Sequence, residues 1–209
     1  MADDDVPSPI DFHDIAQARE WEDATVRNKP WRPQFFAAFV SVLNQRFSEP
    51  FTVLELGSGP GHLAGSLLGN CAISRYVALD FSAAMHQLAR ARLEPLEANV
   101  EFVTQDFPMH NWGEHLDQFD AVVTMQAAHE VRHTRHLVAF FAEARKCLKP
   151  DGVFLYCDSY AAEGRHPNLF VSPEDQPLRL EQAGFRNITK LLDLGGMALF
   201  RATSASIIG

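Results

Sequence analysis

Val53-Leu54-Glu55-Leu56-Gly57-Ser58-Gly59-Pro60-Gly61 joins an apolar run to three closely spaced glycines. The run that starts at Phe51 and ends at Leu56 predicts a buried strand, and residues 62–69 predict a helix directly after the glycines. Glycines let backbone amides approach a ligand closely, and open α/β sheets bind ligands at the carboxyl ends of central strands. The stretch therefore predicts a ligand-binding loop, with a tight turn that binds nothing as the alternative.

The spacing of the glycines excludes two phosphate-binding loops. A dinucleotide fingerprint needs G-x-G-x-x-G, but the residue three places after Gly59 is His62. The phosphate loop G-x-x-x-x-G-K-S/T needs a lysine, which the stretch lacks. Glu55 stands two residues before the first glycine, and its negative charge would repel a pyrophosphate but favour a cationic ligand.

The rest of the chain alternates short apolar runs with helical periods. The expected strands span residues 51–56, 76–79, 100–103, 119–125 and 153–157. The expected helices span residues 62–69, 82–93, 135–148 and 174–183. Such strands predict a parallel sheet covered on both faces, with a turn at Lys149–Gly152 before the fifth strand. Residues 187–194 and 197–203 are joined across Gly195-Gly196, which predicts a hairpin that adds an antiparallel strand.

The residues before the glycine-rich stretch have a different pattern. Residues 1–10 are acidic and contain Pro7 and Pro9, which predicts a disordered tail. Residues 12–26 predict an acid-rich helix, and apolar residues recur at helical spacing from Phe35 to Phe47.

The composition limits the partners that we expect. The chain has 209 residues, with 18 basic and 27 acidic side chains and a formal net charge of −9. An acidic surface lacks the positive field that neutralises phosphates, so neither nucleic acid nor an anionic membrane is an expected partner. The first residues lack the features of a signal peptide, and no window approaches ~18 uninterrupted apolar residues. We therefore expect a cytoplasmic protein with a small-molecule partner, and the sequence does not indicate an oligomeric state.

The glycine-rich stretch closely resembles the first motif of the class I S-adenosylmethionine-dependent methyltransferases, and the resemblance in spacing covers about residues 35–203. It implies a doubly wound, mostly parallel sheet of seven strands, the Rossmann-like class I methyltransferase fold, whose last strand is antiparallel. It also implies an S-adenosylmethionine-binding domain at residues 51–209 and N-terminal lid helices at residues 11–50. In this family the loop lies under the methionine part of the cofactor, which implies cofactor contacts for Glu55, Gly57, Ser58, Gly59 and Gly61.

Two further acids fit the same cofactor. Asp80 ends the second expected strand, where an acid can accept hydrogen bonds from both ribose hydroxyls; a cap for the next helix is the alternative. By resemblance, Asp106 faces the adenine amino group and Phe107 its ring, unless Asp106 is a solvated loop acid. Phe81 and Met85 are further cofactor candidates, although Met85 could instead fill the core.

The segment after the fourth expected strand would pass the transferred methyl group. By resemblance, Met125 or Gln126 would hold the methionine amino group through its carbonyl. His129 has a suitable intrinsic pKa for a general base, with Glu130 or His133 as substitutes, and packing or solvated histidines are the alternative. A base is needed only if the acceptor arrives protonated.

The expected substrate contacts come from two places. Asp158 and Tyr160 follow the fifth strand at the same sheet edge, while Arg27, Trp31 and Arg32 belong to the lid. The two lid arginines could instead pair with nearby acids, which are Glu20, Glu22 and Asp23.

Two other functions remain open at this point. Residues 129–133 read H-E-x-x-H, which is the pattern of zinc-dependent hydrolases, but here the segment leaves a strand directly and no third ligand is identifiable. The cysteines form no C-x-x-C pair, so we expect no metal. A non-catalytic partner subunit that keeps the cofactor fold is the other alternative.

Overall fold

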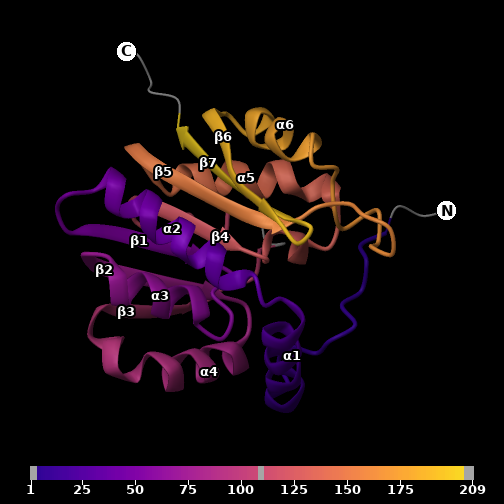
Figure 1. The fold of residues 1–209 in the computed structure, drawn as a ribbon, viewed down its shortest axis with the longest axis horizontal. Coiled ribbons are helices and arrows are strands. Elements are labelled where there is room, and N and C mark those ends of the chain that lie inside the picture. The colour runs from indigo at the N-terminus through magenta and orange to yellow at the C-terminus, as the bar shows by residue number, and fades with distance from the viewer. Residues whose placement is uncertain (1–3, 108–110, 205–209) are drawn as a thin grey trace. The chain divides into compact units, whose positions relative to one another are not determined.

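The computed structural model describes residues 4–107 and 111–204, so the first three residues of the predicted tail lie outside the described residues. The strands form a seven-stranded sheet in the order β3-β2-β1-β4-β5-β7-β6 (Figure 1), which confirms the predicted fold class. The chain divides into two units, of which unit 1 contains residues 1–8 and 106–209 and unit 2 contains residues 9–105.

Unit 2 contains the glycine-rich stretch and three parallel strands. Strand β1 (Phe51–Leu56) pairs with β2 (Ile73–Asp80), which pairs with β3 (Val100–Thr104). Its helices are α1 (Ile15–Asn28), α2 (Arg32–Arg46), α3 (His62–Asn70), α4 (Ala83–Leu93) and the 3-10 helix η1 (Glu94–Asn99). Helix α3 contacts both α2 and α4, so these three helices lie side by side (Figure 1).

Polar caps set the starts of two helices in unit 2. The carboxylate of Asp14 accepts the first N–H groups of α1, so this helix begins at Ile15 rather than at residue 12 as predicted. Ser82 caps α4 by accepting the N–H of Met85. Helix α1 then packs on α4 through an apolar cluster that includes Phe12 and Met85.

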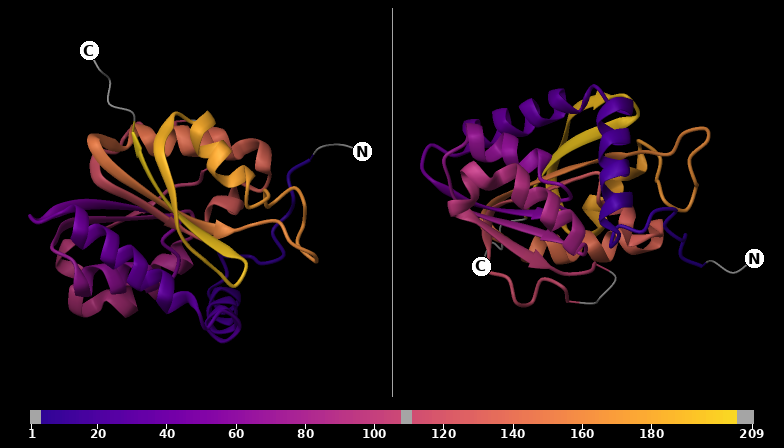
Figure 2. Two further views of the ribbon diagram at one scale, coloured as in Figure 1. Left: turned by 45° about the horizontal axis from the view of Figure 1, so that its top comes forward. Right: turned by 90° about the horizontal axis from the view of Figure 1, so that it is seen from below.

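Unit 1 contains the other four strands. Strand β4 (Phe119–Met125) is parallel to β5 (Leu148–Ser159), whereas β7 (Met197–Ser204) is antiparallel to both β5 and β6 (Phe185–Leu194). The helices are η2 (Ala128–Val131), η3 (Thr134–His136), α5 (Leu137–Lys146) and α6 (Asp175–Gln182). The β6–β7 hairpin, yellow in Figure 2, turns at Gly195 and Gly196, whose φ angles of 61° and 75° suit a type I′ turn.

The predicted turn at Lys149–Gly152 is wrong, because these residues lie inside β5. The pairing with β4 shifts there, from Phe119 opposite Leu148 to Ala121 opposite Val153. The extra residues are absorbed as an irregularity in a continuous strand. Gly152 suits this place because an added Cβ would lie 3.1 Å from the carbonyl oxygen of Phe119.

Within residues 4–107 and 111–204, no helix has both the length and the apolar character needed to cross a membrane.

Candidate active site

The glycine-rich loop is fixed to the end of β2 by its own backbone amides. Gly57 and Ser58 both donate to the carbonyl oxygen of Leu79, at 2.8 and 3.0 Å. Gly59 donates to Oδ2 of Asp80 at 2.8 Å. The φ angles of Gly57, Gly59 and Gly61 are 69°, 52° and 80°, a region that glycine adopts without steric cost.

The loop has room and unused hydrogen-bonding capacity for a ligand. A Cβ added to Gly59 would meet no atom within 4 Å, whereas one added to Gly61 would lie 3.1 Å from the Cβ of Ala89. The hydroxyl of Ser58 is buried and forms no hydrogen bond within the described part of the chain. Gly59 and Ser58 therefore fit the predicted contact with a cofactor, while Gly61 serves the packing of α3 on α4.

Asp80 connects the loop to the start of α4. Its Oδ1 accepts the N–H of Ser82 at 2.9 Å, while its Oδ2 accepts the N–H of Gly59. Ser82, and not Asp80, caps α4, so the alternative role considered for Asp80 is filled by its neighbour. The two bonds hold the carboxylate in one orientation at the end of β2.

Glu55 is almost fully buried, with 2% of its surface exposed. The hydroxyl of Tyr76 donates to Oε2 of Glu55 at 2.7 Å. Burial raises the pKa of Glu55 to about 8; Asp80 also raises it, while the Tyr76 hydrogen bond and the charge of Arg32 oppose the change. Glu55 is thus an acid that changes charge in the physiological pH range.

Two of the predicted cofactor residues pack beside α1. Met85 is buried in the cluster that contains Phe12, which is the core-filling arrangement considered as an alternative. The ring of Phe81 lies 6.0 Å from that of Phe12 and 5.4 Å from that of His13.

Glu22 is one of the acids considered as partners of the two lid arginines. Glu22 pairs with Arg92, and its Oε1 lies 2.9 Å from Nε2 of His62. Arg92 also donates from Nε to the carbonyl oxygen of Pro60 at 2.8 Å, so α1 is connected to the glycine-rich loop through Arg92, a residue that the sequence did not single out. Arg27 is exposed, Trp31 and Arg32 are half-buried, and Arg32 lies over the ring of Phe36.

Unit 1 holds the remaining predicted residues. Asp106 is exposed, whereas Phe107 is buried with its ring 4.9 Å from Phe140 and 5.5 Å from Trp112. Met125 ends β4 and is also buried.

Gln126 has an unusual environment. Its φ angle of 57° is rare for a residue with a side chain, and its backbone N–H donates to the carbonyl oxygen of Cys157 at 2.8 Å. Both polar atoms of its side-chain amide are buried and lack a hydrogen-bond partner among the described residues. An unpaired buried amide is costly, so we expect a water molecule or a ligand to supply the missing bonds.

His129, Glu130 and Asp158 form a cluster of charges, which we call the His129 cluster. Nδ1 of His129 lies 2.9 and 3.1 Å from the two oxygens of Asp158, and the backbone N–H of His129 donates to the same carboxylate at 3.1 Å. Nε2 of His129 lies 3.3 Å from Oε1 of Glu130. Burial alone would lower the pKa of His129, but the two carboxylates overcome this effect and raise it to about 10. The ring of Phe170 stands 5.1 Å away.

The N-terminal residues of unit 1 are tied to this cluster through Arg132. Nη1 of Arg132 donates to Oε2 of Glu130 at 2.8 Å, while Nε and Nη2 donate to the carbonyl oxygens of Val6 and Pro7, both at 2.7 Å. Asp5 pairs with Arg135 and His136. We call residues 5–7 the N-terminal strap.

The H-E-x-x-H pattern does not form the helix that a zinc hydrolase requires. His129 lies in the 3-10 helix η2, Arg132 ends it with a φ angle of 64°, and His133 starts η3 by accepting the N–H of Arg135 on Nδ1 at 3.1 Å. Among the residues that the structure describes, no group of three or more His, Cys, Asp or Glu side chains could hold a metal ion.

Tyr160 is turned to β6, where its hydroxyl donates to Asp193 at 3.0 Å.

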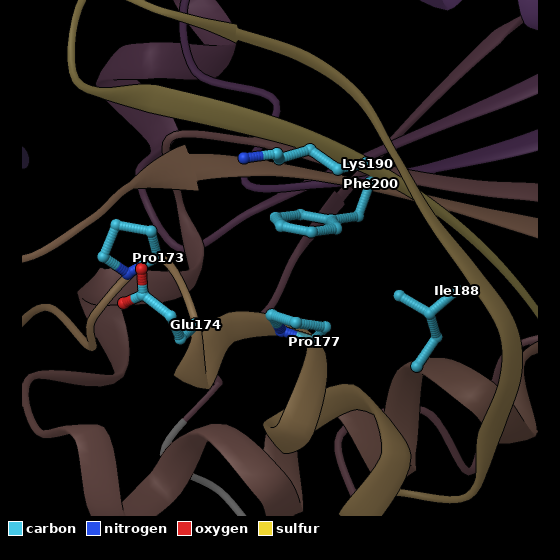
Figure 3. Close-up of a pocket in the computed structure, with 6 residues that line it drawn as sticks. All are labelled: Pro173, Glu174, Pro177, Ile188, Lys190 and Phe200. Atoms are coloured by element: carbon cyan, nitrogen blue, oxygen red, sulfur yellow. The ribbon is translucent and has the colours of Figure 1, made fainter.

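A hollow of about 300 Å³ lies between α6 and the β6–β7 hairpin (Figure 3). Its walls include Phe200, Pro177 and Ile188, with Glu174 and Lys190 as charged residues. None of the residues predicted for the active site lines it.

Residues 53–152 match the family described as "Methyltransferase domain". The chain carries a class I S-adenosylmethionine-dependent methyltransferase domain. The predicted family, enzyme class and cofactor are thereby confirmed. Among curated proteins, no sequence matches the chain.

Several solved structures resemble this methyltransferase. The DhpI–SAH complex is 25% identical, with a TM-score of 0.68 over 91% of this chain and 92% of that chain. An O-methyltransferase family protein from Burkholderia thailandensis is 18% identical, with a TM-score of 0.74 over 93% of this chain and 61% of that one. A complex of the Haloferax volcanii Trm112 methyltransferase activator and a methyltransferase is 20% identical, with a TM-score of 0.70 over 95% of this chain and 99% of that chain. The chain spans only half of the CurJ carbon methyltransferase chain that it also matches.

Proposed function

We propose that this methyltransferase transfers the methyl group of S-adenosylmethionine to a small-molecule acceptor by in-line displacement. The observation that carries the proposal is the hydrogen bond from Gly59 to Asp80, which holds an open glycine loop next to a carboxylate in unit 2. Likeness to DhpI over nearly its whole length supports a small acceptor, because DhpI forms a complex with SAM and HEP. Alignment and exclusion of water supply most of the rate in such a displacement.

The residues predicted from the sequence are the proposed site. The proposed cofactor residues are Glu55, Gly57, Ser58, Gly59, Asp80, Phe81, Asp106, Phe107, Met125 and Gln126. Gly61 and Met85, which were also predicted as cofactor residues, would support this site through their packing. The acceptor residues are Arg27, Trp31, Arg32, Asp158 and Tyr160, with His129, Glu130 and His133 closest to the chemistry. Residues 11–50 are the proposed lid, residues 51–209 the proposed cofactor-binding domain, and the cytoplasm the proposed location.

Calorimetry with S-adenosylhomocysteine tests the cofactor part of this proposal, and absence of binding at millimolar ligand would overturn it. Mass spectrometry of small acceptors incubated with S-adenosylmethionine tests transfer. Binding without turnover on any acceptor would instead favour the non-catalytic subunit considered above.

A further inference from the structure

Arg92, in the last turn of α4, joins helix α1 to the glycine-rich loop. Its Nε donates to the carbonyl oxygen of Pro60 at 2.8 Å, and its Nη2 donates to Oε1 of Glu22 in α1. Nε2 of His62, the first residue of α3, lies 2.9 Å from the same oxygen of Glu22. A guanidinium is a planar fork that can hold two acceptors in fixed directions, so Arg92 fixes the position of Glu22 relative to the Pro60 carbonyl.

Ser82 makes a similar connection at the other end of α4. Its hydroxyl donates to the carbonyl oxygen of Phe12, which precedes α1, and its backbone N–H donates to Oδ1 of Asp80 at 2.9 Å. Asp80 in turn holds Gly59 through its other oxygen. Between the two ends, apolar residues of α4 pack on α1. The segment that contains α1 is therefore fastened at both ends of α4, each time by a residue that also holds a part of the proposed cofactor site.

The glycine-rich loop depends on such anchors. Gly59 and Gly61 flank Pro60 and have φ angles of 52° and 80°, and glycine loses more backbone freedom on ordering than any other residue. The carboxylate of Asp80 holds the loop at Gly59. The guanidinium of Arg92 holds it at Pro60. Loss of either anchor should let the loop sample more conformations, and a ligand that binds only one of them would then bind more weakly.

Glu22 faces Arg92 in a partly buried place. Its side chain is 13% exposed and that of Arg92 is 36% exposed. Burial, together with the charges of Arg92 and Arg32, lowers the pKa of His62 to about 4, so His62 is neutral at pH 7. The positive charge that pairs with Glu22 is thus that of Arg92, and Glu22 holds the guanidinium by charge as well as by the hydrogen bond.

We propose that Glu22 and Arg92 are positioning residues that couple the docking of α1 on α4 to the conformation of the glycine-rich loop. The inference rests on the proposed function, because it takes this loop to be the place where the methionine part of the cofactor binds. Such coupling is reciprocal, so a docked α1 strengthens the binding of the cofactor, and a bound cofactor holds α1 more firmly on α4. Neither side chain has to touch the cofactor for this effect.

Calorimetry with S-adenosylhomocysteine tests the coupling on the full-length protein, Glu22→Gln, Arg92→Ala and the double variant. Each single change should weaken binding by about 5- to 20-fold. The double variant should bind no more weakly than Arg92→Ala, because Glu22 acts through Arg92. Asp23→Asn is the matched control with an unchanged affinity, since Asp23 is an exposed acid of the same helix. Losses that add in the double variant, or an unchanged affinity in Glu22→Gln, would overturn the proposal.

Hydrogen exchange separates this coupling from a merely structural role of Glu22. S-adenosylhomocysteine should slow the exchange of the α1 amides in the unchanged protein and in Asp23→Asn, and much less in Glu22→Gln. If Glu22 only stabilised the fold, the ligand would protect α1 equally in all three proteins, which would contradict the coupling. This comparison does not need Arg92→Ala, so it decides the question even if that variant does not fold.

The same measurements distinguish the two proposals from each other. Absence of S-adenosylhomocysteine binding to the unchanged protein would overturn the proposed function together with this inference. Normal binding without any protection of α1 would overturn the inference alone and leave the proposed function standing.

Discussion

The backbone N–H of Gly59 lies 2.8 Å from Oδ2 of Asp80 and donates a hydrogen bond to it. The bond joins two features that are 21 residues apart, the glycine-rich loop after β1 and the carboxylate at the end of β2. The two groups proposed to hold the methionine part and the ribose of the cofactor are therefore fixed to each other by the protein itself.

Asp80→Ala should weaken the binding of S-adenosylhomocysteine by about 10- to 100-fold, because the loop loses its anchor and the ligand loses a charged partner. Asp80→Asn keeps one oxygen, so its affinity for S-adenosylhomocysteine should lie between those of the unchanged protein and Asp80→Ala. Glu101→Gln is the control, since Glu101 is an exposed acid of unit 2 that pairs with Arg75 on the surface. Calorimetry measures all three; an unchanged affinity in a folded Asp80→Ala protein would remove the ribose assignment.

Glu55 should make the protein less stable as the pH rises from about 4.5 to 8. Its pKa is about 8 in the folded protein and near its ordinary value in the unfolded chain, so between these pH values the unfolded state releases a proton that the folded state retains. The free energy of unfolding should fall by up to about 1.4 kcal/mol per pH unit from this group. Urea denaturation at several pH values measures the slope, which Glu55→Gln should flatten; the same slope in both proteins would contradict the account.

Gly59→Ala and Gly61→Ala should separate binding from stability. Both strain a positive φ angle by about 1–2 kcal/mol, but only the Gly61 methyl would press on Ala89. We expect Gly61→Ala to lower the free energy of unfolding more, by about another 1–3 kcal/mol, and Gly59→Ala to reduce cofactor affinity more. Denaturation curves and calorimetry on the two proteins check the order, and a reversed order would refute the distinction.

Gln126→Met should leave stability unchanged or improve it while it weakens ligand binding. Removing a buried amide with two unpaired atoms relieves a cost of about 1–3 kcal/mol. Gln176→Met is the matched control, because Nε2 of buried Gln176 donates to the Tyr156 hydroxyl and to the Ser159 carbonyl, so here methionine should destabilise. Equal destabilisation of both variants would show that Gln126 has a purely structural role.

The sequence predicts most where neighbouring residues decide the structure. The bounds of β1 and β4 agree with their apolar runs. Strand β2 begins at Ile73, before the predicted start at Tyr76, and the prediction missed this start because the polar residues Ser74 and Arg75 interrupt the apolar run. The hydroxyl of Ser74 nevertheless donates to the carbonyl oxygen of Phe51 in the neighbouring strand, a contact that the local sequence pattern does not predict.

The same distinction applies to the candidate site. The glycine-rich loop and Asp80 were predictable because each stands at the carboxyl end of an apolar run that is visible in the sequence. The pairing of His129 with Asp158 spans 29 residues, and that of Arg92 with Pro60 spans 32. Such pairs come from the alignment of strands and helices in three dimensions, so the sequence could name His129 as a base but could not show that two acids keep it charged.

The N-terminal strap has a practical consequence for anyone who purifies this enzyme. Arg132 grips the backbone of Val6 and Pro7 and, with its remaining nitrogen, the carboxylate of Glu130. An affinity tag fused to the N-terminus would stand a few residues from the guanidinium that also pairs with Glu130. Kinetic constants should therefore be compared before and after the tag is cleaved, because a tag that displaces the N-terminal strap would change the surroundings of Arg132 and Glu130 and with them the measured rate.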